Sequence, residues 1–388
     1  MLGLALALPL LGAAPPAPDV WYGPNSLRPG AMIRGDFFGN VSDVEESWPQ
    51  LSGDVTTFKI FLDMLYGPPG KPGLAPGMGS TDAQLSTLIA ALKARGIRTG
   101  VEVGGTAWSA GFCTLEETLK YASMEQQWVG RWLKLGGTID SLTTDHANVK
   151  NIRGVKGNKH NGCVPAVPMA SRIEIVAQVF RSWRTFLGQQ ASLGFIESLG
   201  FWDILGPGGT NFTNTDPTEL NPIPGWIPRL EDVTTMLLAA ATKYNPTPEV
   251  PLIDHYFIDF SMEGVEYDSQ KYGSPPGGGV NYGRVLGAEV IMHRHGLKTG
   301  IFLNAFHDRA QLNCSVLPAL GPEGCSGSAA SRTINYTDGY MKLPGRMSEH
   351  AVLEQWQPYP SITGPESVAN TGMWMALQCA DAVKQHVY

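Results

Sequence analysis

The chain has 388 residues, of which 43% are hydrophobic and 16% are charged. This is enough apolar material for one large core or two ordinary ones, so a largely disordered protein is excluded. The formal net charge of −7 argues against nucleic acid as a partner, because phosphate binding needs clustered Lys and Arg.

The N-terminus begins with an apolar block at Leu2–Leu11, which is followed by small residues. A block this short does not span a bilayer and is typical of the core of a secretory signal. We therefore expect residues 1–20 to be a leader and residues 21–388 to form the catalytic domain. We also expect a secreted protein that has no membrane partner.

Two further patterns, glycosylation triplets and cysteine pairs, are relevant only if the protein is secreted. Candidate N-glycosylation triplets occur at Asn40, Asn211, Asn313 and Asn335. Of the five cysteines, we expect Cys113 to pair with Cys163 and Cys314 to pair with Cys325. Cys379 would stay a free buried thiol in a helix, although sequence cannot prove the connectivity. The sequence has no cluster of Cys and His residues of the kind that would predict structural zinc.

Strand-like runs and helical patterns alternate along the chain. The strand-like runs are residues 31–38, 56–65, 98–105, 137–145, 193–198, 254–263, 298–306 and 350–360. Capping-box patterns predict helix starts near residues 81, 114 and 171, each with Ser or Thr three residues before Glu or Gln. Further helices are predicted over 230–244, 282–295 and 365–386.

This alternation implies parallel strands, because a parallel return needs a crossover. Eight such units predict an α/β fold, a single-domain (β/α)8 TIM barrel with long βα loops. The segments 95–104 and 295–304 share a pattern of Gly, aliphatic, Arg or Lys, Thr, Gly, which is mild support for an internal repeat. A doubly wound open sheet is the alternative, but no GxGxxG follows the first run.

The active site of such a barrel lies at the carboxyl ends of the strands. Nearly every run ends in a polar side chain, and the candidates are Asp36, Lys59, Glu102, Asp145, Glu197, Asp259, Glu263, Asn304 and Glu354. Alternate side chains share one face of a strand, so Glu102, Asp259 and Asn304 are expected to point into the barrel. By the same alternation, Ser261 and Glu263 should share the face of Asp259.

Crowded carboxylates push one another's pKa values apart, so one stays protonated while another is ionised. Glycosidic bond cleavage uses such a pair. Each acid also has a structural interpretation, as a cap of the next helix or a partner of a loop arginine. Tryptophans that follow the runs could stack on sugars or anchor loops over the barrel rim, and these are Trp108, Trp202, Trp226 and Trp356.

The layout, with its ending EQWQPYP, resembles the TIM-barrel glycoside hydrolases over about residues 31–388. It matches no single family's full motif, because the fourth run ends in Asp145 and the seventh in Asn304, where the largest clan has glutamates. An Asp on the fourth strand with a Glu on the fifth resembles the amylase-like arrangement. This resemblance implies Asp145 as nucleophile or base and Glu197 as general acid, with Asp259 and Glu263 as rivals for either role.

We therefore expect an enzyme without a cofactor that hydrolyses O-glycosyl bonds of a poly- or oligosaccharide, and we expect it to be a monomer. Residues expected from their places at or after the strand-like runs to hold the sugar are Asp36, Lys59, Glu102, Trp108, Trp202, Asn304, Glu354 and Trp356. Carboxyl groups about 5 Å apart would give retention, and about 6.5–9.5 Å inversion. The basic loop 146–162 could attract an anionic glycan, or it could simply be solvated.

Two other functions remain open. A metal-dependent hydrolase or phosphodiesterase could use His146, His255 and His307, which lie near ends of the runs. No HxH follows the first run, however, and His293-x-His295 precedes the seventh. A non-catalytic carbohydrate-binding barrel would keep the aromatic residues but need no acid pair.

Overall fold

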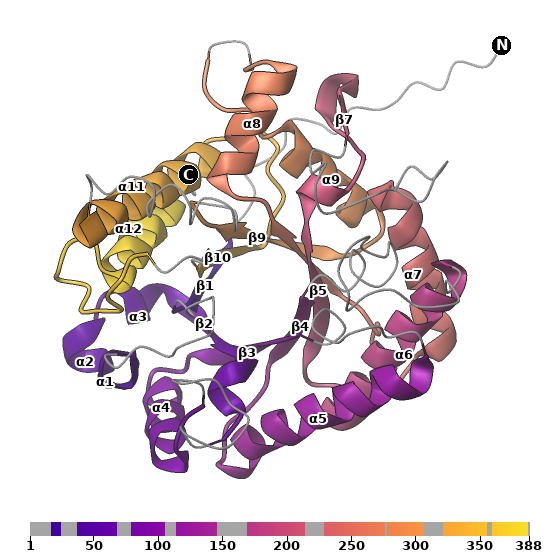
Figure 1. The fold of residues 1–388 in the computed structure, drawn as a ribbon, viewed down its shortest axis with the longest axis horizontal. Helices are drawn as coiled ribbons and strands as arrows, with labels where there is room; N and C mark the ends of the chain where they lie inside the picture. Colours follow the sequence, from indigo (N-terminus) through magenta and orange to yellow (C-terminus); the bar gives the residue numbers. More distant parts are fainter. Residues whose placement is uncertain are drawn as a thin grey trace.

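The computed structural model describes residues 17–24, 37–67, 79–104, 114–145, 169–213, 229–275, 278–305, 321–354 and 359–386. Eight parallel strands close into a barrel in the order β1-β10-β9-β8-β5-β4-β3-β2, and helices surround it (Figure 1). The strands are β1 (Asp19–Gly23), β2 (Val55–Phe61), β3 (Arg98–Val103), β4 (Ser141–Asp145), β5 (Ser192–Ser198), β8 (His255–Asp259), β9 (Lys298–Leu303) and β10 (His350–Glu354). The predicted (β/α)8 TIM barrel is confirmed.

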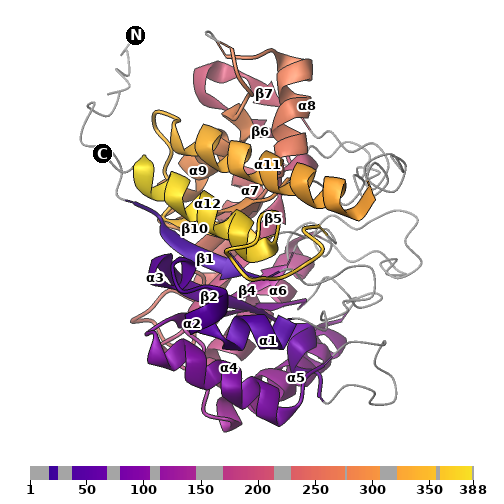
Figure 2. The same cartoon turned by 90° about the vertical axis from the view of Figure 1, so that its left-hand side faces the viewer.

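The helices of the described residues lie between successive strands, and α12 follows the last strand. They are α1 (Phe37–Ser42), α2 (Val44–Ser47), α3 (Leu51–Asp54), α4 (Asp82–Ala94), α5 (Leu115–Lys134), α6 (Met169–Leu187), α7 (Leu230–Tyr244), α8 (Met262–Tyr272), α9 (Gly283–Arg294), α11 (Gly321–Met341) and α12 (Gly372–Gln385). Short 3-10 turns are η1 (Leu62–Leu65), η3 (Leu199–Phe201) and η4 (Pro207–Gly209). A small antiparallel hairpin, β6 (Ile204–Leu205) with β7 (Asn211–Phe212), lies with α8 at one edge outside the ring (Figures 1 and 2).

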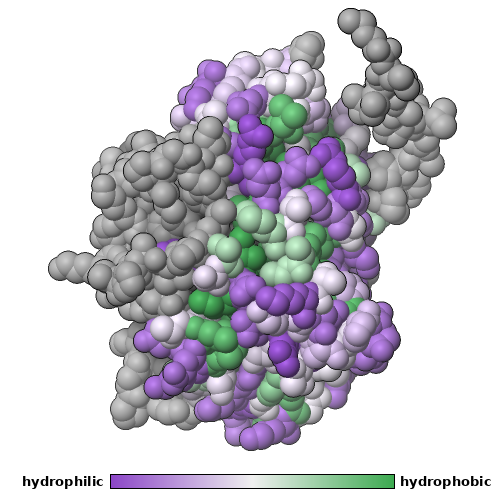
Figure 3. Space-filling view, turned by 90° about the vertical axis from the view of Figure 1, so that its right-hand side faces the viewer, coloured by the Kyte–Doolittle hydropathy of each residue, from purple (hydrophilic) through white to green (hydrophobic). Residues whose placement is uncertain are grey.

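The helices cover the barrel with their apolar sides. The face that carries α5, α6 and α7 is mainly hydrophilic, with small hydrophobic patches between (Figure 3). Among the described residues, no helix is long and apolar enough to cross a membrane. The predicted capping box of α4 is confirmed, because the Thr81 side chain accepts from the Gln84 backbone and the Gln84 side chain accepts from the Thr81 backbone.

The first strand was predicted in the wrong place. The barrel begins with Asp19–Gly23, which pairs with both β10 and β2. Phe37 and Phe38, placed in a strand by the prediction, instead begin α1. Residues 31–36 lie outside the described part of the chain, as do residues 1–16 of the predicted leader. The expected leader boundary at residue 20 falls inside β1, and the leader itself stays a prediction.

The helix start predicted at Ser171 is also misplaced. Helix α6 begins at Met169, so Ser171 and Glu174 lie inside it and do not form the predicted capping box.

In the amino-terminal half of the barrel interior, glycines lie beside large aromatic rings. Trp21 packs on Phe257 with ring centroids 5.1 Å apart and on His350 at 5.3 Å. These rings need neighbours without side chains, because a Cβ at Gly300 would lie 2.5 Å from Phe257 Cδ1 and one at Gly100 would lie 2.9 Å from Trp21. Interior rings therefore fill the amino-terminal half of the barrel.

Replacing Gly300 by alanine is expected to lower the free energy of unfolding by about 1–3 kcal/mol, because the new methyl group overpacks Phe257. Urea denaturation measures this. The matched control is Gly39→Ala, since Gly39 is exposed in α1 and a Cβ there meets nothing within 4 Å. Alanine at this helical position should be neutral or slightly stabilising. Equal destabilisation by both substitutions would contradict the packing argument.

Candidate active site

Strand register identifies which candidate side chains face the inside of the barrel. Paired residues of parallel neighbours point to the same side, so each register pair extends the interior set around the ring. Phe257 is interior because it contacts Trp21 across the barrel. Gly300 pairs with Phe257, and Phe302 pairs with Asp259. Tracing these pairs around the barrel assigns the interior face to Lys59, Glu102, Asp145, Asp259 and Glu354.

Lys59 forms the centre of this interior set. It is 2% exposed. Its ammonium pairs with the Glu102 carboxylate and lies 2.5 Å from Glu354 Oε2. It also lies over the Phe302 ring, 4.3 Å from the centroid, which adds a cation–π attraction. Strands β2, β3, β9 and β10 are thus joined through one cation.

Gly23 makes room for the Glu354 carboxyl group. The two residues are register partners at the carboxyl ends of β1 and β10. A Cβ at Gly23 would lie 2.6 Å from Glu354 Oε2. Only glycine leaves this carboxyl group the space to reach Lys59.

Charges in this buried group do not balance if both glutamates are ionised. The pKa of Glu354 is raised to about 8, mainly by burial and also by the charges of Glu102 and Asp259, while Lys59 opposes the shift. Burial alone would lower the pKa of Lys59, but Glu102 and Glu354 outweigh it and the pKa is raised. One ammonium neutralises one carboxylate, so the second carboxyl group is stabilised by keeping its proton.

Asp259 stands close to this group, at the end of β8 and half-buried. Its charge is one of the causes that raise the pKa of Glu354. Asn304 follows β9 and is 1% exposed. Its Nδ2 donates to Asp259 Oδ1 at 3.3 Å. The inward direction predicted for Glu102, Asp259 and Asn304 agrees with these contacts.

Asp145 and Glu197, proposed as a pair from sequence, occupy opposite faces of neighbouring strands. Asp145 is 2% exposed and pairs in register with Ile196, so Glu197 falls on the alternate face. On that face Phe195 packs against Phe180 of α6. Glu197 is fully buried there, and its charge is among the causes that raise the pKa of Tyr256. The backbone alternation therefore does not bring these two carboxyl groups to one interior surface.

Glu263 was predicted to share a strand face with Asp259, and this is wrong. Strand β8 ends at Asp259, and Ser261 is the N-cap of α8. Glu263 lies in the first turn of that helix, where a carboxylate is stabilised by the helix dipole.

Trp202 is fully buried rather than presented at a cleft. This favours its interpretation as an anchor of the segment after β5. The other aromatic candidates Trp108, Trp226 and Trp356 lie outside the described residues, as do Asp36 and the basic loop 146–162. Their predicted sugar-binding roles stay predictions.

The cysteine pattern is described in part. Cys379 is a free, buried cysteine, as predicted. Cys325 is buried in α11. Cys113, Cys163 and Cys314 lie outside the described residues, so both disulfide pairings stay predictions.

Histidines do not gather at the carboxyl end in the described part of the chain. His255 begins β8 at the amino end of the barrel and stacks on His350, with ring centroids 5.0 Å apart. Burial lowers the pKa of His350 to about 4. His146 and His307 lie outside the described residues. Among the described residues, no three His, Cys, Asp or Glu side chains are arranged to hold a metal ion.

Sequence reasoning treated Lys59 and Glu354 as holders of sugar hydroxyls and missed that they pair with each other. The signal available was parity, because Thr57, Lys59 and Phe61 alternate with Phe58 and Ile60 along β2. A lysine on the interior face of a buried strand requires a carboxylate partner.

Comparisons with known proteins add little to this geometry. No family model and no curated protein matches the sequence. The chain is similar to the solved structure of N2152 from Neocallimastix frontalis, with 12% identity over 95% of this chain and 69% of that chain and a TM-score of 0.46. It is also similar to a GH10 xylanase containing a bacterial Ig-like domain from termite gut, with 11% identity over 95% and 78% and a TM-score of 0.46.

A third similar structure is the HpcH/HpaI aldolase from Desulfitobacterium hafniense DCB-2, with 10% identity over 87% of this chain and 86% of that chain and a TM-score of 0.31. A likeness at this level of identity does not indicate a reaction for this chain.

Proposed function

We propose that this protein is a secreted glycoside hydrolase whose reacting groups are the Glu354 and Asp259 carboxyl groups at the carboxyl end of the barrel. One observation carries the proposal: Lys59 joins Glu102 and Glu354 inside the barrel, and Asp259 is close enough to raise the pKa of Glu354. Glycosidic bond cleavage needs one carboxyl group that is protonated and one that is ionised.

Glu354 suits the role of general acid. A general acid must hold a proton at the working pH and give it to the leaving oxygen. Lys59 is a single cation between two glutamates, and the pKa of Glu354 is raised, mainly by burial, which favours its protonated form. After it donates that proton, the Glu354 carboxylate would be stabilised by the same ammonium group.

Asp259 suits the role of the ionised partner. It points to the interior, and the Asn304 amide donates to its Oδ1. A hydrogen bond to the charged form favours that form and fixes its orientation. Asp145 is the other interior carboxylate that could act as nucleophile or base, and it shares the carboxyl end of the barrel on β4.

Lys59 is poorly suited to act as an amine nucleophile. Such a lysine needs a lowered pKa, whereas Glu102 and Glu354 raise the pKa of Lys59. We assign it an electrostatic role. The carbohydrate is proposed to be a poly- or oligosaccharide, and an anionic glycan is the variant suggested by the basic loop 146–162.

The proposal is tested by incubating the full-length protein with a panel of neutral and anionic glycans and measuring released reducing ends. We expect turnover of at least one glycan, which persists in the presence of a strong chelator. Activity lost to the chelator would support the metal-dependent hydrolase instead. Glycan binding without turnover would support the carbohydrate-binding barrel.

The raised pKa of Glu354 predicts that glycan hydrolysis in the same assay depends on pH. The pKa of Glu354 is raised to about 8, so the acid is protonated below this pH and loses its proton as the pH rises through it. We expect kcat/KM to decline above about pH 8. This basic limb should be absent from the residual activity of a Glu354→Gln variant, and a basic limb that persists there would assign it to another group.

A further inference from the structure

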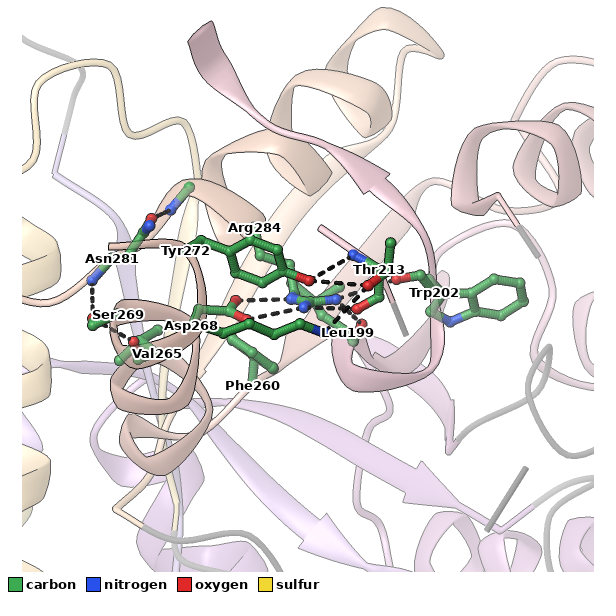
Figure 4. Close-up of polar contacts among 12 residues, drawn as sticks. Leu199, Trp202, Thr213, Phe260, Val265, Asp268, Ser269, Tyr272, Asn281 and Arg284 are labelled. Atoms are coloured by element: carbon green, nitrogen blue, oxygen red, sulfur yellow. Dashed lines mark hydrogen bonds and ion pairs between the residues drawn. The ribbon is translucent and has the colours of Figure 1, made fainter. Parts of the chain in front are cut away.

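Arg284 is a fully buried cation that lies beside the segments following β5 and β8. It belongs to the first turn of α9, and both it and its partner Asp268 of α8 have fully buried side chains. Arg284 Nε lies 2.8 Å from Asp268 Oδ2, and Nη2 lies 2.9 Å from Oδ1. This bidentate pair is the strong form of an arginine–carboxylate contact (Figure 4).

The remaining donors of Arg284 bind backbone carbonyl groups of the segment after β5. Nη1 donates to Leu199 O at 3.3 Å and to Trp202 O at 3.2 Å, and Nη2 donates to Thr213 O at 3.1 Å. A guanidinium group has five N–H donors in a fixed fork. Lysine could reproduce neither the number nor the directions of these bonds.

The same guanidinium group also contacts the segment after β8. Its carbon lies 5.4 Å from the centroid of the Phe260 ring, and Phe260 directly follows Asp259. The Phe260 carbonyl oxygen accepts a 2.5 Å hydrogen bond from the Tyr336 hydroxyl of α11. Arg284 therefore touches the chain immediately after both β5 and β8, which are neighbours in the barrel.

Further hydrogen bonds secure the surroundings of Arg284. The Thr213 N–H donates to the Tyr272 hydroxyl at 3.0 Å, which ties the hairpin to the end of α8. The Asn281 N–H donates to Ser269 Oγ at 2.6 Å, which ties α8 to the approach to α9 (Figure 4). The network joins three segments that meet at one corner of the barrel mouth.

We infer that Arg284 is a positioning residue, which holds the carboxyl ends of β5 and β8 together and so fixes where Asp259 stands relative to Glu354. The contribution of Arg284 to catalysis rests on the function proposed above. Glu354 contacts Lys59 of β2, and the other charges that act on it are Glu102 of β3 and Asp259 of β8. Of these, only Asp259 belongs to a strand whose following segment contacts Arg284.

The test uses the double variant Arg284→Met/Asp268→Ala, which removes the network without leaving an unpaired buried charge. The control is Arg184→Met. Arg184 is also buried, and it donates to Ala191 O and Pro251 O, just before β5 and β8. It joins the same region of the barrel at the opposite ends of these strands.

Two readouts need no substrate. Amide hydrogen exchange over Leu199–Phe212 and Met262–Tyr272 is expected to become about tenfold faster or more in the double variant, while β2 stays protected. The infrared carboxylic band that Glu354→Gln lacks reports the titration of Glu354. The midpoint pH of this titration is expected to fall by ~0.5 unit or more, because a displaced Asp259 raises the pKa of Glu354 less. Arg184→Met should leave this midpoint unchanged.

On the glycan identified in the panel, kcat should fall about tenfold to a hundredfold with KM changed much less. Unchanged exchange, or faster exchange without a shifted Glu354 midpoint, would overturn the inference. An equal midpoint shift in Arg184→Met would overturn it too, since the effect would then be general destabilisation. If both physical readouts change as expected and no glycan is hydrolysed, the positioning role stands and the proposed function fails.

Discussion

Replacing Glu354 by glutamine is expected to lower kcat for glycan hydrolysis by about 10²–10⁴-fold, the usual contribution of a positioned general acid. Glutamine keeps the shape of the side chain and an oxygen that accepts from Lys59, but it has no acidic proton to give. The fold should survive, because the Lys59–Glu102 pair remains. Steady-state kinetics measures kcat, and circular dichroism tests whether the fold is kept.

The matched control is Glu116→Gln, which makes the same chemical change at an exposed position in the first turn of α5. It should keep full activity. A second check uses substrates with better leaving groups, since a sugar whose leaving group needs no proton should be hydrolysed almost normally by Glu354→Gln. If the variant hydrolyses all glycans at the parent rate, Glu354 is not the general acid.

Replacing Lys59 by methionine is expected to lower the free energy of unfolding by about 3–5 kcal/mol, because it leaves buried carboxyl groups without their cation. The contacts of the ammonium group with Glu102 and Glu354 are both lost. Urea denaturation at pH 7 measures the change. Lowering the pH should reduce the deficit, since protonation removes the unpaired charge.

The double variant Lys59→Met/Glu102→Gln separates charge from packing. It removes the cation together with the carboxylate that the cation neutralises, so much of the stability should return. The matched control is Lys243→Met, which breaks an exposed pair with Glu174 and should leave the free energy of unfolding almost unchanged, because solvent screens exposed pairs. A double variant no more stable than Lys59→Met would show that the ammonium acts through its packing alone.

The barrel could be predicted from sequence because its signals are local. The run around Lys59 has the apolar composition of a buried strand, and it forms β2 (Val55–Phe61). Thr81 and Gln84 mark the start of α4 through neighbouring atoms. The first strand was missed because Asp19–Gly23 is short and follows prolines, so its apolar residues were assigned to the boundary of a leader.

The candidate site could be predicted only in part because its contacts are distant in sequence. Lys59 and Glu354 are separated by 295 positions, and nothing local to either residue identifies the other. Glu197 was chosen by its place after an apolar run, but the phase of the alternation in β5 depends on its register with β4 and β8. Glu263 was misplaced because the apolar run continues past Asp259 although the strand ends there.

The rings of Trp21, Phe257 and His350, packed into the spaces beside glycines, give the barrel a solid floor. Among the described residues, these rings close the amino-terminal half of the barrel below Glu354. In the proposed hydrolase, substrate and product would therefore enter and leave at the carboxyl end. A product that stays bound there would compete with substrate and slow turnover as the reaction proceeds.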